Sequence, residues 1–181
     1  MKFDIPDDFN EKVLEFDEIL KKFNAIHNLT NYDNLNPIVK DSINGLKYIT
    51  NTPTIAIDIG SGAGFPAIFL AMILKDCKWH LFEPIYKKSS FLTYAKLNLN
   101  LKNVTIHSSK IEDEKSFRAD LITSRALMHT KRLLEICQGY YDENTEFLLY
   151  KGSSYQSEIE GLSAKVFNHK TRNYILFKGV N

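Results

Sequence analysis

The feature that most constrains the fold of this chain is an alternation of short apolar runs with helical stretches, which begins at Thr54. Short runs bounded by turn residues favour buried strands, and apolar residues spaced three and four apart favour helices. Strands that alternate with helices of this length indicate βαβ units and a largely parallel sheet. We predict strands at Thr54–Ile59, Trp79–Phe82, Val104–His107, Leu121–Thr123 and Glu146–Tyr150, and helices at Pro66–Leu74, Ile85–Asn98 and Thr130–Tyr140.

Both ends of the chain depart from this alternation. A first helix is expected over residues 7–23, because apolar side chains recur on one face and two lysines fall in the last turn. Asn36-Pro37 is typical of a helix start, and that second helix is expected to reach about Tyr48. Lys165–His169 and Tyr174–Phe177 have no helix between them, so we expect an antiparallel hairpin at one edge of the sheet.

Composition limits the cellular setting. The longest apolar run, Phe65–Leu74, is too short to cross a bilayer. The first twenty residues are polar and acidic, unlike a secretory signal. The only cysteines are Cys77 and Cys137, and no CxxC or HExxH box occurs. Sparse cysteine fits a reducing compartment, and a structural zinc site is disfavoured. We therefore expect a cytoplasmic protein with no membrane anchor and no metal, and a monomer as the simplest assembly.

The net charge of +1 conceals an uneven distribution. Residues 1–20 hold two lysines against seven acidic residues, whereas residues 75–118 hold nine basic against five acidic ones. A positive excess on the body of the protein favours a polyanionic partner through steering and phosphate contacts. An ordinary lysine-rich solvated surface explains the same excess equally well.

A glycine-rich turn, Gly60-Ser61-Gly62-Ala63-Gly64, follows the first predicted strand and opens a helix. Ligands of open α/β sheets bind beyond the carboxyl ends of the strands, where glycines let the backbone approach them closely. A dinucleotide fingerprint needs a third glycine where Phe65 stands, and a phosphate loop needs a Gly-Lys-Ser/Thr ending that is absent. The spacing, preceded by Asp58, resembles the first motif of Rossmann-like methyltransferases that bind S-adenosylmethionine. Glu83 ends the next strand and can accept hydrogen bonds from both ribose hydroxyls.

The chain as a whole resembles the RsmG (GidB) family of bacterial small-subunit ribosomal RNA guanine-N7 methyltransferases. The similarity covers nearly the whole length, and the Asn-Leu-Thr and Ser-Arg-Ala elements are its most specific parts. It is carried by Phe23-Asn24, Asn28-Leu29-Thr30, Asp41-Ser42, Asp58 to Pro66, Lys87, Phe91-Leu92, Ile111-Glu112, Asp120, Ser124-Arg125-Ala126 and Lys151-Gly152. The chain has Ile38, Ala67, Glu83, Lys88 and Lys110 where that family usually has histidine, glycine, aspartate, arginine and arginine.

The resemblance implies a class I methyltransferase fold: a three-layer sandwich with a mostly parallel seven-stranded sheet and N-terminal helices. It implies one domain, with residues 1–50 as a helical lid and residues 51–181 as the Rossmann-like core. S-adenosylmethionine is the implied cofactor, and 16S ribosomal RNA in the small subunit is the implied partner. The implied cofactor-binding residues are Gly60, Gly62, Phe65, Glu83, Ile111, Glu112 and Arg125. Arg125 is also the implied catalytic residue, and Asn28, Thr30, Asp41, Lys151 and Arg172 are the implied substrate contacts.

The chemistry implied by the resemblance needs few catalytic groups. Guanine N7 has an in-plane lone pair and no proton, so it can attack the sulfonium methyl group without a general base. In agreement, the sequence lacks the Asn/Asp-Pro-Pro-aromatic motif of exocyclic-amine methylation, and neither cysteine has a Pro-Cys context. Catalysis would then rest on holding N7, methyl and sulfur in line, which can be worth about 7–11 kcal/mol.

Three other functions are compatible with parts of the pattern. A small-molecule methyltransferase would share the cofactor site but would need neither the Asn-Leu-Thr nor the Ser-Arg-Ala element. A nucleotide-binding regulatory module would have lost catalysis, against which the intact glycine turn argues. An NAD-dependent oxidoreductase is disfavoured by Phe65 in place of the third glycine.

Overall fold

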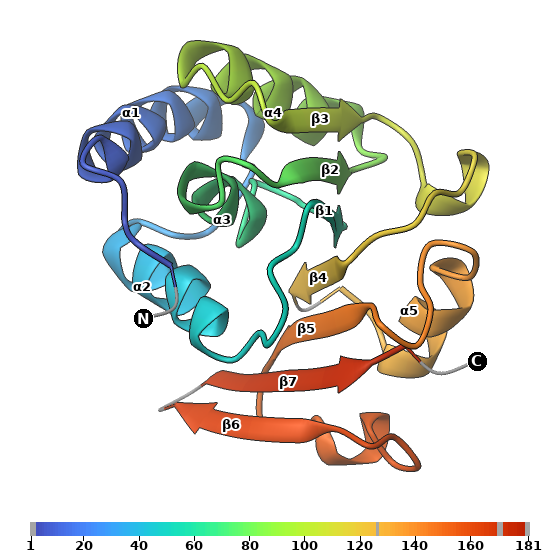
Figure 1. The fold of residues 1–181 in the computed structure, drawn as a ribbon. Helices are drawn as coiled ribbons and strands as arrows, with labels where there is room; N and C mark the ends of the chain where they lie inside the picture. The colour runs from blue at the N-terminus through green and yellow to red at the C-terminus, as the bar shows by residue number, and fades with distance from the viewer. Residues whose placement is uncertain (1–2, 126, 170–171, 180–181) are drawn as a thin grey trace.

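A seven-stranded sheet with strand order β3-β2-β1-β4-β5-β7-β6 forms the centre of the molecule. The computed structural model describes residues 3–125, 127–169 and 172–179. Strands β1 to β5 run parallel, and β7 is antiparallel to both β5 and β6. The opposite directions of β6 and β7 can be followed in Figure 1. The strands are β1 (Ile55–Ile59), β2 (Lys78–Phe82), β3 (Val104–His107), β4 (Leu121–Arg125), β5 (Glu146–Lys151), β6 (Lys165–His169) and β7 (Arg172–Lys178).

Helices connect the successive parallel strands as the sequence predicts, except that only a 3-10 turn lies between β3 and β4. They are α1 (Phe9–His27), α2 (Asn36–Asn44), α3 (Ala67–Ile73), α4 (Tyr86–Asn98) and α5 (Thr130–Ile136), with short 3-10 turns at Gly45–Lys47, Ile111–Asp113 and Gln156–Glu158. Every predicted strand is present, and the closing hairpin is confirmed as β6 and β7. The predicted fold class, a mostly parallel seven-stranded sheet between helical layers, is confirmed.

The predicted ends of three helices are wrong. Helix α1 continues one turn beyond residue 23 and ends at His27, and its cap Asn28 adopts a left-handed conformation with φ of 48°. Helix α2 begins one residue earlier than a cap at Asn36 would require, because Asn36 is its first residue and Leu35 its cap, and it gives way to a 3-10 turn at Gly45. Helix α5 ends at Ile136 instead of Tyr140. Helix ends depend on local capping and packing, so a pattern of apolar spacing locates them poorly.

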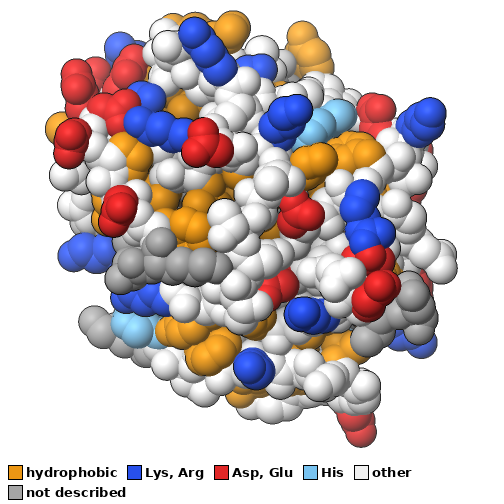
Figure 2. Space-filling model, viewed as in Figure 1, with side chains coloured by type: hydrophobic (Ala, Val, Ile, Leu, Met, Phe, Trp, Pro, Cys, Tyr) orange, Lys and Arg blue, Asp and Glu red, His pale blue; other side chains and the backbone are white. Residues whose placement is uncertain are grey.

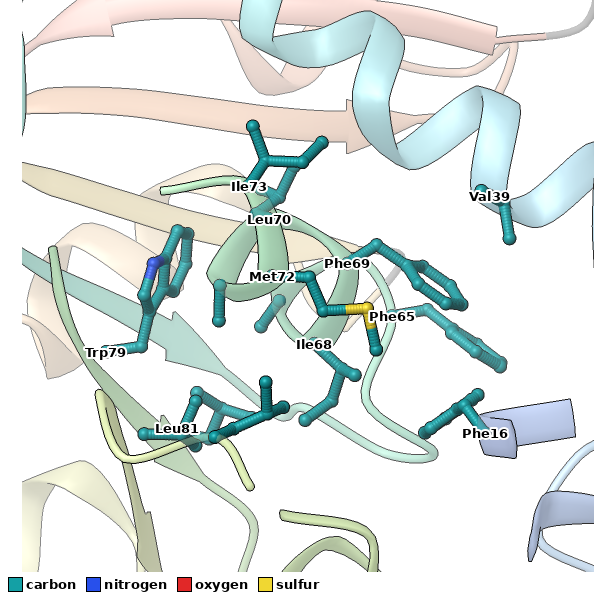
Figure 3. Close-up of a cluster of buried hydrophobic side chains, with 14 of the residues drawn as sticks. Phe16, Val39, Phe65, Ile68, Phe69, Leu70, Met72, Ile73, Trp79 and Leu81 are labelled. Atoms are coloured by element: carbon teal, nitrogen blue, oxygen red, sulfur yellow. The ribbon is translucent and has the colours of Figure 1, made fainter. Parts of the chain in front are cut away.

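Each face of the sheet has its own hydrophobic core because side chains alternate along a strand. Trp79 and Leu81 point to the face covered by α1, α2, α3 and α4, whereas Phe82 belongs to the opposite core with α5. Helix α3 lies at the centre of the first core, and all seven of its residues are buried (Figure 3). A helix that is apolar on every side is stable only when surrounded by protein.

The surface shows where the charges predicted from the sequence lie. Acidic side chains gather at the upper left of the face in Figure 2, where α1 lies in Figure 1.

Cys77 and Cys137 are both buried and free, so they form no disulfide. Within the described residues, no helix combines the length and the hydropathy needed to cross a membrane. Over the same residues, no group of three His, Cys, Asp or Glu side chains is arranged to hold a metal ion.

Candidate cofactor and substrate site

The glycine turn joins β1 to α3 at the carboxyl edge of the sheet. Gly60, Gly62 and Gly64 have φ angles of 67°, 59° and 91°, in the left-handed region that glycine adopts without a steric penalty. The amides of Gly60 and Ser61 donate to the carbonyl of Phe82 at 2.9 and 3.2 Å, which fixes the turn against β2. The GxGxG spacing is therefore a requirement of backbone geometry.

Strand register brings three predicted site residues into one row. Ile59 is paired with Phe82 on one side and with Ser124 on the other. The residues that follow these three, Gly60, Glu83 and Arg125, therefore leave adjacent parallel strands at the same edge. Residues far apart in the sequence meet there because parallel strands end on the same side.

Glu83 binds the glycine turn directly. Its Oε2 accepts a hydrogen bond from the Gly62 amide at 2.8 Å, and its Oε1 accepts one from the Ile85 amide at 2.9 Å. The side chain is only 3% exposed, so these bonds compensate for the burial of its charge. Because a carboxylate can accept about four hydrogen bonds, each oxygen keeps a free lone pair for a ribose hydroxyl.

No side chain crowds the turn at Gly62. A Cβ atom added there would meet only the Gly60 carbonyl oxygen, at an ordinary contact distance of 3.9 Å. A Cβ atom at Gly60 would instead lie 2.5 Å from the side chain of Leu127. The residues present thus fit S-adenosylmethionine: an uncrowded glycine turn lies beside a carboxylate with spare acceptor capacity.

Asp58, the last acidic residue before the turn, is buried at 1% exposure. Its Oδ1 is bonded to the Thr123 hydroxyl at 2.6 Å, while Oδ2 has no hydrogen-bond partner among the described residues. Burial raises the pKa of Asp58 to about 7, although the bonds from Thr123 and Ser61 oppose the shift. The group therefore sits close to half-protonated at neutral pH.

The predicted adenine contacts follow β3. Ile111 is 2% exposed, and its carbonyl accepts a hydrogen bond from the Tyr140 hydroxyl at 2.9 Å. Glu112 is exposed and lies 3.5 Å from the Arg132 guanidinium. Tyr140 thus anchors the backbone of this short 3-10 turn, while Glu112 extends into solvent at the same edge of the sheet.

Arg125 is a nearly buried cation at the end of β4. Its side chain is 9% exposed and lies 3.4 Å from Asp41. Its Nη2 donates to the Tyr32 hydroxyl at 3.2 Å, and the guanidinium carbon lies 5.5 Å from the centre of the Tyr32 ring. Its Nη1 is buried without a hydrogen-bond partner among the described residues. The next residue of the Ser-Arg-Ala element, Ala126, lies outside the described residues.

Asp41 links α2 to the C-terminal hairpin. Its two carboxylate oxygens share the single N–H of Arg172 Nε, at 3.0 and 3.2 Å, and Oδ1 also accepts a hydrogen bond from the Tyr174 hydroxyl at 2.9 Å. With Arg125 at 3.4 Å, two guanidinium groups share one carboxylate. The structure thus brings together three predicted site residues from α2, β4 and β7, namely Asp41, Arg125 and Arg172.

The Asn-Leu-Thr segment forms a turn that Asn24 holds in place. Asn24 Oδ1 accepts hydrogen bonds from the Leu29 and Thr30 amides at 2.6 and 2.9 Å. Asn24 Nδ2 donates a hydrogen bond to the Thr30 carbonyl at 2.9 Å. Asn28 is exposed at the left-handed end of α1, where Lys87 donates to the preceding carbonyl of His27 at 2.9 Å. These bonds give Asn24 and Lys87 structural roles, while Asn28 and Thr30 are positioned by the turn.

Lys151 lies apart from the Asp41 cluster. It is 6% exposed, and its ammonium donates to Glu158 at 2.6 Å and to the Met128 carbonyl at 2.7 Å. Glu158 also accepts hydrogen bonds from the amide and the hydroxyl of Thr130. The charge of Lys151 is therefore already balanced, and the group lines a different pocket beside Leu127.

Two residues of the site were missed by sequence reasoning. Tyr32 places its ring against Arg125 and 6.0 Å from the ring of Phe65, at the end of the glycine turn. Tyr174 supplies a hydrogen bond to Asp41 from the hairpin. No spacing rule connects either tyrosine to the glycine turn; the only hint was that Tyr32 follows the Asn-Leu-Thr segment by two residues.

Comparisons with known proteins agree with this geometry. Residues 9–179 match the family model described as GidB, rRNA small subunit methyltransferase G. The ribosomal RNA small subunit methyltransferase G of Campylobacter curvus is 59% identical over 172 residues, covering 95% of this chain and 92% of the relative. The same enzyme of Campylobacter hominis is 56% identical over 174 residues, covering 96% and 95%.

A solved structure shows the same fold at low sequence identity. It is a putative S-adenosyl-L-methionine-dependent methyltransferase from Methanococcus maripaludis, 15% identical with a TM-score of 0.66, and the match covers 93% of this chain and 92% of that one. Since the family model spans nearly all of the sequence, the chain belongs to the family of rRNA small subunit methyltransferase G, enzymes that use S-adenosylmethionine to methylate ribosomal RNA.

Proposed function

We propose that this protein transfers the methyl group of S-adenosylmethionine to N7 of a guanosine in 16S ribosomal RNA of the small subunit. One observation carries the assignment of the site. The glycine turn, its bound carboxylate Glu83 and the enclosed guanidinium of Arg125 leave three adjacent strands in one row. Family membership supports the ribosomal RNA substrate.

The cofactor would lie across the ends of β1, β2 and β3. Gly60, Gly62 and Phe65 would contact it through the turn, and Glu83 would accept hydrogen bonds from its ribose hydroxyls. Ile111 and Glu112 would border its adenine. S-adenosylmethionine supplies an electrophilic methyl group when bound. The fit is supported by the uncrowded turn at Gly62 and by the spare lone pairs of Glu83.

The protein would act mainly by positioning. Guanine N7 needs no base to remove a proton, and Arg125, the proposed catalytic residue, cannot act as one because its guanidinium stays charged. Its fixed charge beside Tyr32 would orient the incoming nucleotide at the ends of β1 and β4. Alignment of this kind lowers the barrier because the reacting groups no longer have to find each other.

The substrate side would be formed by the segment 1–50, acting as a lid, and by the hairpin. Asn28, Thr30, Asp41, Lys151 and Arg172 are the proposed substrate-side residues. The contact of Tyr32 with both Phe65 and Arg125 supports the lid, because Tyr32 belongs to this segment and Phe65 follows the glycine turn. A monomeric enzyme without a metal, acting on ribosomes in the cytoplasm, is the simplest arrangement consistent with this surface.

The decisive experiment is methylation of small ribosomal subunits from a strain that lacks this enzyme. Incubation with tritiated S-adenosylmethionine should label the 16S RNA, and cleavage specific for N7-methylguanosine should map the label to one site. Label on small metabolites but not on RNA would instead support a small-molecule methyltransferase. Tight binding of NADH, with none of S-adenosylmethionine, would refute the cofactor assignment.

In the same assay, Arg125→Ala should lose activity on the order of a hundredfold while staying folded, since a reactant misplaced by about 1 Å can cost about that factor. The fold should persist because Asp41 keeps its bonds to Arg172 and Tyr174. Circular dichroism and thermal unfolding would check this. Full activity in the variant would show that Arg125 is not part of the active site.

A further inference from the structure

A pocket of about 860 Å³ opens between α2, the segment that precedes it, and the C-terminal hairpin. Its lining includes Tyr32, Ile38, Lys40, Asp41, Arg125 and Arg172. The glycine turn and Glu83 are not part of its described lining. The pocket therefore lies beside the cofactor edge and shares Arg125 with it, but it belongs to the substrate side.

The pocket carries an excess of positive charge. Asp41 is the only acidic residue of its described lining, and both Arg125 and Arg172 lie within 3.4 Å of its carboxylate. Two guanidinium groups on one carboxylate leave one positive charge unbalanced, and Lys40 adds a second. Because the side chains of Asp41 and Arg125 are 14% and 9% exposed, water screens these charges poorly.

Both guanidinium groups have unused donors. Arg125 Nη1 is buried with no hydrogen-bond partner among the described residues. A buried donor without a partner costs free energy, which a bound acceptor would recover. Arg172 contacts Asp41 only through Nε in the described structure, at 3.0 and 3.2 Å. Among the described residues its two Nη groups make no hydrogen bond, and guanidinium groups bind phosphate well because their donors form a planar fork.

We propose that this pocket binds a backbone phosphate of the RNA beside the target guanosine, held by Arg172 and Arg125. This inference rests on the proposed function, because it names the group that the substrate presents to the same site. A carboxylate of the cofactor would offer similar chemistry. The phosphate is favoured because the pocket is lined by α2 and the hairpin, away from the turn that holds the cofactor.

Asp41 then has a positioning role and makes no contact with the RNA itself. Its oxygens already accept bonds from Arg172 and Tyr174, and it would repel a phosphate if it approached alone. By holding Arg172 through Nε and Arg125 at 3.4 Å, it fixes two guanidinium groups that would otherwise repel each other. The carboxylate thus preorganises the pocket for a single anion.

The test compares Arg172→Gln with Lys102→Gln, which removes the same charge at the opposite edge of the sheet, just before β3. Arg172→Gln should raise the KM for small ribosomal subunits on the order of tenfold, as expected for a lost charged hydrogen bond. The slope of log kcat/KM against log salt should fall by roughly 0.7, the value for one phosphate contact on a single strand. Arg172→Lys should keep part of the slope because it keeps the charge.

Calorimetry with S-adenosylmethionine should give the same Kd for the wild type and for Arg172→Gln. Lys102→Gln should match the wild type in KM and in salt slope. If Arg172→Gln and Lys102→Gln behaved alike, the phosphate pocket would be ruled out while the methyltransferase assignment stood. A weaker cofactor Kd with an unchanged KM for RNA would show that the anion is the cofactor carboxylate. Failure of the wild type to methylate RNA would refute the proposed function itself.

Discussion

At the scale of single residues, Asp58 shows how burial changes the chemistry of a side chain. Its pKa is raised to about 7, mainly by burial, and Oδ2 lacks a hydrogen-bond partner among the described residues. The folded state therefore binds a proton more tightly than the unfolded chain, whose carboxyl titrates near 3.8. The contribution of Asp58 to stability is present below pH 3.8 and is lost as the pH rises towards 7.

Asp58→Asn should remove this pH dependence. Between pH 5 and pH 7 the wild type should lose about 2 kcal/mol of unfolding free energy relative to the variant. The reason is that, over these two pH units, folded Asp58 still holds a proton that the unfolded chain has released. Urea unfolding at both pH values measures it. The exposed change Asp76→Asn is the matched control and should shift neither value. A constant difference between Asp58→Asn and the wild type would contradict the raised pKa.

At the scale of secondary-structure elements, β2 and β3 are joined by a pair of histidines. His80 Nδ1 and His107 Nε2 lie 3.0 Å apart, so one ring donates and the other accepts. Burial lowers the pKa of both rings, and for His80 the charges of His107 and Lys78 lower it further. The two histidines thus bind protons more weakly in the folded chain than in the unfolded chain. The stability from this pair is complete above pH 6.5 and is lost as the pH falls below it.

Asp58 and the histidine pair change stability in opposite directions as the pH falls. Once Asp58 is replaced by Asn, the histidine pair should make the protein easier to unfold at pH 5 than at pH 7. The comparison is therefore made in the Asp58→Asn background, with and without His107→Gln. The drop on acidification should be smaller in the double variant, because only one histidine titrates. Urea midpoints at the two pH values give the result. Equal drops in both proteins would show that the pair does not govern the acid response.

At the scale of the whole molecule, α1 attaches to the body of the protein through one aromatic cluster. Phe16 is fully buried, and its ring centre lies 5.4 to 6.0 Å from those of Phe65, Phe69 and Phe91 (Figure 3). One side chain from α1 therefore contacts the end of the glycine turn, α3 and α4. The helix that carries the acidic surface is held in place by apolar packing against α3 and α4.

Phe16→Ala should lower the free energy of unfolding by about 3–5 kcal/mol, the usual cost of removing a buried phenylalanine ring. Leu14→Ala on the same helix is the control, because Leu14 is 68% exposed, and it should change stability by less than about 0.5 kcal/mol. Urea denaturation followed by circular dichroism distinguishes the two. Equal effects would mean that α1 is not anchored through Phe16.

The candidate site was only partly predictable from the sequence. The glycine turn and Glu83 could be found because they are close in sequence and their spacing follows from strand and turn geometry. The cluster joins Asp41 to Arg125 and Arg172, which follow it by more than eighty positions, and no local pattern connects them. Tyr32 and Tyr174 were missed for the same reason. Lys151 was expected on the substrate side, yet its charge is matched by Glu158, a partner that spacing does not reveal.

The sequence by itself determined the parallel sheet, the order of helices and strands, and the glycine turn, because each depends on the period of apolar residues or on backbone conformation within a few residues. Only the tertiary structure decided which charges meet. Strand order places β4 between β1 and β5, and β7 beside β5. That arrangement brings a helix, a strand end and a hairpin around one carboxylate. Pairings of this kind depend on the path of the whole chain through space.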